Sequence, residues 1–189
     1  MSSDTSSANK ALLPSVVVII GVSGSGKSTI ASMLAHQLGW EFQDGDWFHP
    51  RQNVEKMQSG MPLTDEDRWP WLEAIAAWID RTRETRQHGV VACSALKRSY
   101  RDVLVGNRPD VRIVYLKGTP ELIARRLVTR TGHFMPTSLL ESQFRTLEEP
   151  EPKENPITVS IEPIPSVIVA AILAQLKASA QHACPRETA

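Results

Sequence analysis

The chain has 189 residues with 21 acidic and 21 basic side chains, so its formal net charge of zero lacks the basic excess that a nucleic-acid-binding surface needs. No apolar run is long enough for a membrane span, and the length suits one soluble domain with a substantial core. The two cysteines, Cys93 and Cys184, lie far apart, which favours a reducing cytoplasm over a disulfide framework.

Both ends of the sequence look different from its middle. The first ten residues are polar and Ser-rich and have no apolar signal core. We expect flexible tails at 1–13 and 178–189, which flank a single folded domain at 14–177.

The first folded stretch is a β-branched run, Val16–Ile20, which is followed by a glycine-rich loop and then by apolar residues at helical spacing over 29–38. The loop fits the P-loop pattern, in which glycines let backbone amides surround phosphate oxygens. Lys27 would reach the β- and γ-phosphates of ATP, and Ser28 would offer a hydroxyl to Mg²⁺. A flexible Gly/Ser loop would match the letters but not both flanks. The predicted nucleotide site comprises Gly21, Val22, Ser23, Gly24, Ser25, Gly26, Lys27, Ser28 and Thr29.

The rest of the chain alternates strand-like and helix-like segments. We expect strands at 40–44, 90–93, 111–116 and 157–161. We expect helices at 50–59, from Thr64 to about 87, and at 97–105, 120–129, 139–147 and 166–176. This order predicts an α/β fold, a five-stranded parallel sheet with helices on both faces, whose ligands bind beyond the carboxyl ends of the strands. The Gly- and Pro-containing segment 131–136 is expected to be a mobile lid.

Two acidic residues, Asp44 and Asp46, follow the second expected strand. If the chain stays extended there, both carboxylates face the same way and lie beside the phosphates. We predict that Asp44 holds the water shell of Mg²⁺, and that Asp46 orients a substrate hydroxyl and accepts its proton. The third strand ends at Ser94, where many P-loop proteins have a magnesium-binding aspartate, so Asp44 becomes more important. An Asp-Gly turn with solvated carboxylates is the alternative.

Cations near the strand ends are further candidates. Lys97 and Arg98 open a helix, where the dipole disfavours positive charge, so a nearby anionic ligand would explain them; two solvated cations are the alternative. Arg126 and Arg130 share a helix face and are predicted to neutralise the transferred phosphate when the lid closes. Stabilisation of the helix C-terminus would explain these arginines equally simply.

Two histidines, His49 and His133, lie in loops beside these elements. Neither has a cysteine or aspartate at ligand spacing, so the pattern does not favour zinc. Either ring could donate to a polyhydroxyl or carboxylate ligand, although a lone histidine is more often structural or solvated.

Further strings accompany these motifs, in a fixed order along residues 16–176. They are Gly21-Val-Ser-Gly-Ser-Gly-Lys-Ser28, Asp44-Gly-Asp46, Phe48-His49-Pro50, Asn53-Val-Glu-Lys-Met57, Pro62-Leu-Thr-Asp-Glu-Asp-Arg68, Trp71-Leu72, Cys93-Ser-Ala-Leu-Lys97, Tyr100-Arg-Asp102, Tyr115-Leu-Lys-Gly118, Gly132-His-Phe134 and Gln143-Phe-Arg-Thr-Leu-Glu-Glu-Pro150. Together they resemble the gluconate kinases, P-loop small-molecule kinases related to shikimate kinase and nucleoside monophosphate kinases. The P-loop identifies only the superfamily, whereas the later strings are more specific.

The resemblance implies ATP-dependent phosphorylation of D-gluconate at its 6-hydroxyl by a cytoplasmic homodimer, at the entrance to the pentose phosphate or Entner–Doudoroff route. It implies no nucleic-acid or membrane partner, and Mg²⁺ at Ser28 and Asp44. Arg125 is a weaker match to the lid arginines than its neighbours. The implied catalytic residues are Lys27, Asp46, Arg126 and Arg130. The implied substrate-binding residues are Asp46, His49, Arg68, Lys97 and His133.

Other functions compete with this one. Shikimate kinases also place two acids after the second strand, but normally have a glycine triplet after the third, where this chain has Ser94-Ala95-Leu96. A nucleoside monophosphate kinase fits the strings less well. A non-catalytic nucleotide sensor is disfavoured because Lys27, Ser28, Asp44 and Asp46 occur together. The topology suggests residues 162–165 as an edge of the adenine site.

Overall fold

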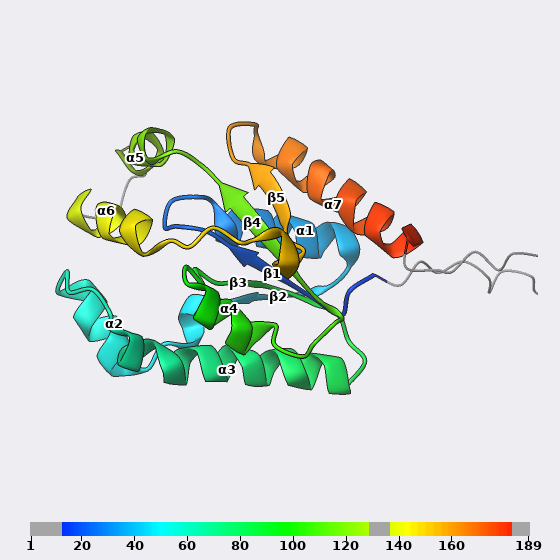
Figure 1. Cartoon of the computed structure of the whole chain (residues 1–189), viewed down its shortest axis with the longest axis horizontal. Coiled ribbons are helices and arrows are strands. Elements are labelled where there is room, and N and C mark those ends of the chain that lie inside the picture. Colours follow the sequence, from blue (N-terminus) through cyan, green and yellow to red (C-terminus); the bar gives the residue numbers. More distant parts are fainter. Residues whose placement is uncertain (1–12, 129–136, 183–189) are drawn as a thin grey trace, which may run out of the picture.

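The computed structural model describes residues 13–128 and 137–182, which form a parallel sheet between two layers of helices (Figure 1). The five strands lie in the order β2-β3-β1-β4-β5, and every neighbouring pair is parallel. They are β1 (Val16–Ile20), β2 (Glu41–Asp44), β3 (Gly89–Ala92), β4 (Val111–Lys117) and β5 (Ile157–Ser160). The predicted fold class is confirmed.

Seven α-helices and two short 3-10 helices lie within the described ranges. The α-helices are α1 (Lys27–Leu38), α2 (Arg51–Gln58), α3 (Asp65–Glu84), α4 (Arg98–Leu104), α5 (Pro120–Val128), α6 (Thr137–Thr146) and α7 (Pro165–His182); the 3-10 helices are η1 (Gly45–Phe48) and η2 (Pro152–Glu154). Helix α7 continues through residues that were expected to begin the C-terminal tail. None of the helices in the described ranges is both long and apolar enough to cross a bilayer.

The central strand β1 explains why the sheet is covered on both sides. Its side chains alternate, so Val17 and Ile19 pack with α1 and α7, whereas Val16, Val18 and Ile20 pack with α3 and α4. All five are essentially inaccessible to solvent. A continuous apolar strand is typical of a parallel sheet for this reason, because neither face can meet water.

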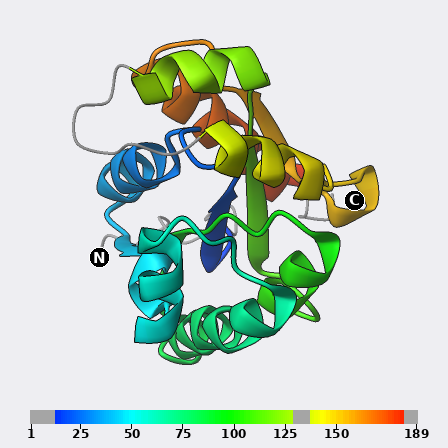
Figure 2. The same ribbon diagram turned by 90° about the vertical axis from the view of Figure 1, so that its left-hand side faces the viewer.

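The two ends of the sheet differ in their surroundings. The carboxyl ends of the strands lie on the left of Figure 1, next to α2, α5 and α6, and the described chain begins and ends near the other edge. Figure 2 looks onto the carboxyl ends of the strands, which these three helices surround. We call this end of the sheet the carboxyl edge, and the end where the strands begin the amino edge. Ligands of open parallel sheets bind at this edge, so the candidate site is sought there.

Candidate active site

The glycine-rich loop joins β1 to α1 at the carboxyl edge. Gly24 and Gly26 have φ angles of 81° and 94°, a conformation that side-chain-bearing residues rarely adopt. A Cβ on Gly24 would also lie 2.9 Å from the side chain of Leu127 in α5. Glycine is therefore needed here both for the turn and for the close packing of α5 against the loop.

Side chains make two of the hydrogen bonds that hold the loop. The Nζ atom of Lys27 donates to the carbonyl of Val22 at 3.1 Å. The backbone N–H of Ser23 donates to Oε1 of Gln143, in α6, at 2.7 Å. One backbone N–H of the loop is thus already hydrogen-bonded to a side-chain oxygen of α6.

The two predicted carboxylates lie next to the loop, but the chain between them is not extended. Asp44 accepts from the Ser28 hydroxyl at 2.7 Å and, through its other oxygen, from the backbone N–H of Asp46 at 3.1 Å. The backbone turns into η1 at Gly45. A Cβ on Gly45 would lie 2.4 Å from the carbonyl oxygen of Ala92, which explains the glycine. The expected alternation across 44–46 is therefore wrong, although Asp44 does adjoin Ser28.

The Asp46 side chain is exposed to solvent, but many protein atoms surround its carboxyl, and the pKa of this carboxyl is raised above the ordinary aspartate value. Burial by the surrounding protein is the largest cause, the negative charge of Asp44 adds to it, and the positive charge of Lys27 opposes it. The thiol of Cys93 lies beneath these groups, and burial raises its pKa to about 12, so it stays protonated. The charges of Lys27, Asp46 and Arg68 all act on this thiol, which indicates that they gather around the end of β3.

His49 follows η1 and stacks on Trp71 of α3, with ring centroids 4.3 Å apart. Trp71 is fixed in turn by its indole N–H, which donates to the carbonyl of Gly45 at 2.7 Å. Burial and the nearby charge of Arg68 lower the pKa of His49 to about 4, so the ring is neutral at pH 7. Its Nδ1 atom is buried and finds no hydrogen-bond partner within the described ranges, which leaves it available to a bound ligand.

Lys97 lies at the N-terminus of α4 and forms an ion pair with Asp65 at 2.7 Å. Tyr100 donates its hydroxyl to the same carboxylate at 2.5 Å. Hydrogen bonds from Lys97 and Tyr100 keep the pKa of Asp65 below its ordinary value. The cations of Lys97 and Arg68 also lie 5.6 Å and 5.7 Å from the centroid of the Tyr100 ring. A protein carboxylate therefore accounts for part of the charge on Lys97 before any ligand binds.

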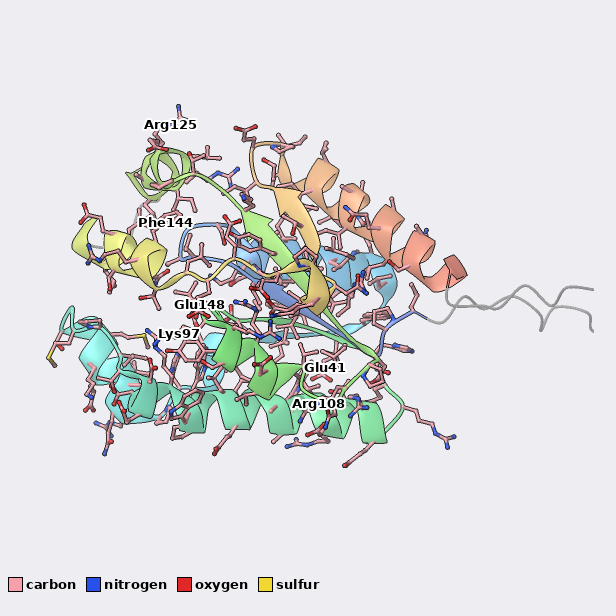
Figure 3. All side chains as sticks on the ribbon, viewed as in Figure 1. Glu41, Lys97, Arg108, Arg125, Phe144 and Glu148 are labelled. Atoms are coloured by element: carbon pink, nitrogen blue, oxygen red, sulfur yellow. The ribbon has the colours of Figure 1, made fainter. Side chains whose placement is uncertain are left out.

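Arg98 does not belong to this group. Its side chain pairs with Glu151 at 3.1 Å, and its backbone N–H donates to Glu148 at 2.6 Å. Figure 3 labels Lys97 and Glu148 at the carboxyl edge, between α6 and α4. The anionic partners of Arg98 come from the chain itself, so this cation needs no ligand to explain it.

The arginines of α5 point in different directions. The guanidinium of Arg126 donates to the carbonyl of Ile161, just after β5, and lies 4.0 Å from the position of a Cβ on Gly26. Arg125 is exposed on the outer side of α5 (Figure 3). Arg130, His133 and the expected lid at 131–136 lie outside the described residues.

Three residues that matter here were not singled out by the spacing of residues in the sequence. Gln143 and Asp65 lie 120 and 32 residues from the groups they contact, and no local pattern links them. Arg101 is the third: its guanidinium, 2% exposed, donates to both carboxylate oxygens of Glu154 and to the carbonyls of Ala95, Leu96 and Glu148. It ties the segment 148–154 to the loop after β3. All three occur in or beside strings that carried the family resemblance, which was the only signal for them.

Metal ligands are scarce in this part of the molecule. Over the described ranges, no group of three or more His, Cys, Asp or Glu side chains could hold a metal ion. Ser28 and Asp44 supply oxygen ligands, of the kind that Mg²⁺ prefers when phosphate and water complete its shell. The residues present fit Mg²⁺ bound together with a nucleotide.

Comparisons with known proteins identify the relatives of this chain. The sequence model of the shikimate kinase family matches residues 23–163. The chain is 46% identical to a gluconokinase of Gluconobacter oxydans over 88% of its length and 94% of that protein, and 48% identical to the thermoresistant gluconokinase of Escherichia coli over 76% and 82%. A crystal structure of a gluconokinase from Sinorhizobium meliloti superimposes with a TM-score of 0.83 at 44% identity, covering 90% of this chain and 95% of that one.

Proposed function

The chain belongs to the gluconokinases, within the broader shikimate kinase family of P-loop kinases, and we propose that it transfers the γ-phosphate of ATP to D-gluconate, giving 6-phospho-D-gluconate and ADP. The observation that carries this proposal is the arrangement at the carboxyl edge. A P-loop with Lys27 lies beside Asp44 and Asp46, and a hydrogen-bonding surface around His49 and Lys97 lies next to them.

The nucleotide side of the site is the loop between β1 and α1. Its amides would surround the phosphates, and Lys27 would exchange the Val22 carbonyl for a phosphate oxygen. We propose that Ser28 and Asp44 hold Mg²⁺, which supplies charge neutralisation at the β- and γ-phosphates when bound. The exposed side chain of Ile164, in the predicted 162–165 edge, offers apolar surface to the adenine.

Asp46 is the proposed base. It lies beside Asp44 and within the influence of Lys27, at the junction between the two halves of the site. Its raised pKa brings the carboxylate closer to the working pH and so makes it a better proton acceptor than an ordinary aspartate. It would orient the 6-hydroxyl of gluconate and take its proton as the phosphoryl group transfers.

The acceptor side suits an anion that carries many hydroxyls. The neutral ring of His49 has an unsatisfied nitrogen, and Arg68 and Lys97 add positive charge around Tyr100. Arg126, beside the P-loop, is placed to stabilise charge on the transferred group. We extend the same role to Arg130, and substrate binding to His133, on the family resemblance; a lid at 131–136 would exclude water during transfer.

The resemblance also supports a cytoplasmic homodimer built from one domain at 14–177. Sedimentation of the purified protein at several concentrations would test the dimer. A mass that stays at that of one chain would contradict it.

A substrate panel tests the function directly. We expect ATP-dependent ADP release, followed in a coupled assay, to be faster with D-gluconate than with shikimate, glucose or nucleoside monophosphates. The product should be identified as 6-phospho-D-gluconate by mass spectrometry and phosphorus NMR. Faster turnover with shikimate than with gluconate would overturn the proposal, and hydrolysis of ATP that no acceptor stimulates would favour a nucleotide sensor.

A further inference from the structure

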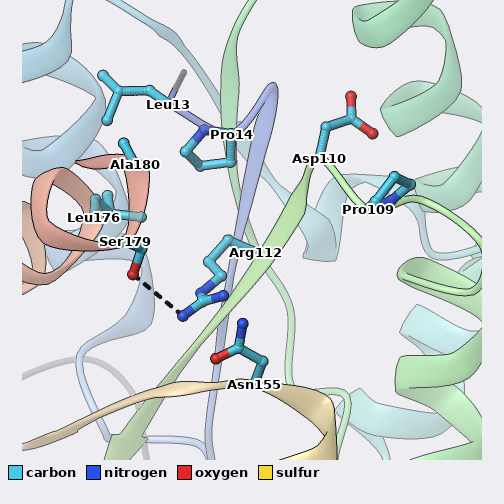
Figure 4. Close-up of a pocket in the computed structure, with 9 residues that line it drawn as sticks. All are labelled: Leu13, Pro14, Pro109, Asp110, Arg112, Asn155, Leu176, Ser179 and Ala180. Carbon is cyan, nitrogen blue, oxygen red and sulfur yellow. Dashed lines mark hydrogen bonds between the residues drawn. The ribbon is translucent and has the colours of Figure 1, made fainter. Parts of the chain in front are cut away.

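A second pocket lies at the amino edge of the sheet, at the opposite ends of β1 and β4 from the P-loop (Figure 4). Its volume is about 430 Å³, within the range of small-molecule sites. It is formed by the segment before β1, the start of β4, the loop before β5 and the last turns of α7. The residues that line it are Leu13, Pro14, Pro109, Asp110, Arg112, Asn155, Leu176, Ser179 and Ala180.

Arg112 brings a positive charge into this pocket with little to balance it. Its Nε atom is buried and has no hydrogen-bond partner among residues 13–128 and 137–182. Within these ranges its guanidinium makes one long hydrogen bond, from Nη2 to the Ser179 hydroxyl oxygen at 3.5 Å, and no ion pair. Burial lowers its pKa, and no carboxylate of the described residues offsets that effect. A partly desolvated guanidinium without an anion is an energetically unfavourable arrangement in a folded protein.

The acidic residue in the pocket does not serve as that anion. Both oxygens of Asp110 accept from Nε of Arg83, at 2.9 Å and 3.0 Å. Asn155 instead places its side-chain amide beside the guanidinium of Arg112 (Figure 4), and no hydrogen bond joins that amide to the other described residues. Two neighbouring groups with N–H donors therefore lack an acceptor between them.

The remaining walls are apolar. Leu13 and Pro14 lie near Leu176 and Ala180 of α7, on the same side of Arg112 (Figure 4). A ligand here meets one guanidinium and one amide at one end and hydrocarbon at the other. A single cation beside an already paired aspartate matches one negative charge better than two, and the guanidinium edge matches the two oxygens of a carboxylate.

We propose that this pocket binds a small monocarboxylate with a short aliphatic body, its carboxylate on Arg112 and Asn155 and its hydrocarbon against α7 and the segment before β1. The site is separate from the P-loop site, which lies at the opposite edge of the sheet. The proposal is independent of which acceptor the kinase uses.

A structural role for Arg112 makes a different prediction. Ser179 lies in the last turn of α7, where exposed carbonyls favour a cation. If Arg112 served mainly to stabilise this helix end, Arg112→Met would lower the melting temperature of the ligand-free protein. If the Arg112 guanidinium serves to bind a ligand, ligand-free Arg112→Met should melt at the same temperature as the parent protein or at a higher one.

Isobutyrate is the probe, titrated into the full chain while the Nε–H signals of arginine side chains are followed by ¹H–¹⁵N NMR, with affinity measured by calorimetry. We expect saturable binding that shifts the Arg112 signal, no binding of the neutral isostere isobutyramide, and weaker binding of inorganic phosphate. Arg112→Met should reduce the affinity at least about tenfold, with Arg112→Lys in between, because a charge-assisted hydrogen bond is lost. Arg81→Met, at an exposed arginine of α3, is the matched control and should bind like the parent.

Equal affinity of isobutyrate for the parent and Arg112→Met, or equal affinity for isobutyramide, would overturn the proposal. So would a clear drop in the melting temperature of ligand-free Arg112→Met. Residues 1–12 and 183–189, which lie outside the described ranges, carry acids of their own. Isobutyrate binding that appears only after Asp4→Asn and Glu187→Gln are introduced would show that the chain supplies the carboxylate, and the free-ligand proposal would fail.

Discussion

Each end of the sheet holds an arginine that is shielded from water, almost completely for Arg101 and partly for Arg112, but the partners of the two arginines differ. At the carboxyl edge, Arg101 is 2% exposed and pairs with both oxygens of Glu154 while also donating to three carbonyls. At the amino edge, the buried Nε of Arg112 has no partner in the described part of the chain, where its guanidinium makes one long contact, to Ser179. Burial of a charge is therefore no guide to its role, since only the partners distinguish a structural cation from one left open to a ligand.

The same contrast separates the charges within the carboxyl edge. Arg98 and Arg101 are occupied by carboxylates of the segment 148–154. Asp46 and His49 are not balanced in this way, and their pKa values move in the directions that burial dictates. Ionisable groups that the fold does not pair with an opposite charge are candidates for catalysis or ligand binding. The following substitutions test whether such groups differ in role from the paired ones.

The largest effect is expected from Arg101→Met. The change leaves Glu154, 6% exposed, without its partner, and should lower the free energy of unfolding by about 3–5 kcal/mol in denaturant titrations. Arg98→Met is the matched control, because its exposed ion pairs should be worth less than about 1 kcal/mol. Equal losses from the two variants would break the distinction between a buried paired arginine and an exposed one.

Asp46→Asn should reduce kcat by roughly 10²-fold or more, because the amide cannot accept the proton of the substrate hydroxyl. Asp110→Asn, at the amino edge, is the control; it should lower stability by breaking the contact to Arg83 but leave kcat unchanged. The parent should lose activity as the pH falls through the raised pKa of Asp46, since the working form is the carboxylate. Unchanged turnover in Asp46→Asn would remove the proposed base.

Lys97→Met should raise the KM for gluconate about tenfold, because a charge-assisted contact to the anionic acceptor is lost, and should leave the KM for ATP unchanged. Steady-state kinetics with each substrate varied in turn measures both constants. Lys153→Met, at an exposed lysine of η2, is the control. A fall in ATP affinity would instead place Lys97 on the nucleotide side.

His49 predicts a pH-dependent stability. Its folded pKa of about 4 lies below the ordinary value of 6.5, so the unfolded chain binds the proton more readily in this window. Its contribution is complete above pH 6.5 and is lost as the pH falls to 4, by at most about 1.4 kcal/mol per pH unit. His49→Gln should flatten this part of the curve of unfolding free energy against pH. Curves of the same slope for the parent and His49→Gln would exclude this linkage.

The smallest effect is expected at Gln143. Its oxygen accepts a hydrogen bond from the Ser23 amide, so Gln143→Ala should remove a competitor for that amide and tighten ATP binding by a factor of about two to five. Calorimetric titration with a non-hydrolysable ATP analogue measures the change. Weaker binding would show that Gln143 contacts the nucleotide rather than competing with it.

The sequence by itself determined the succession of strands and helices along the chain, because the buried parallel strands read as continuous apolar runs between helical patterns. It also determined the P-loop and the acids at Asp44 and Asp46, since their letters and local spacing carry the chemistry. The expected extended chain across 44–46 failed because Gly45 packs under the carbonyl of Ala92, a contact between segments far apart in sequence.

Only the tertiary structure decided which charges are satisfied. Lys97 meets Asp65, Arg101 meets Glu154 and Gln143 meets the P-loop across 32, 53 and 120 residues, distances over which no periodicity operates. Arg112 would read as an ordinary strand residue, and the lack of an anionic partner for it among the described residues appears only when β4, α7 and the loop before β5 are brought together. Sequence patterns report local backbone preference and burial, whereas the pairing of charges depends on which side chains the folded sheet brings within hydrogen-bond distance.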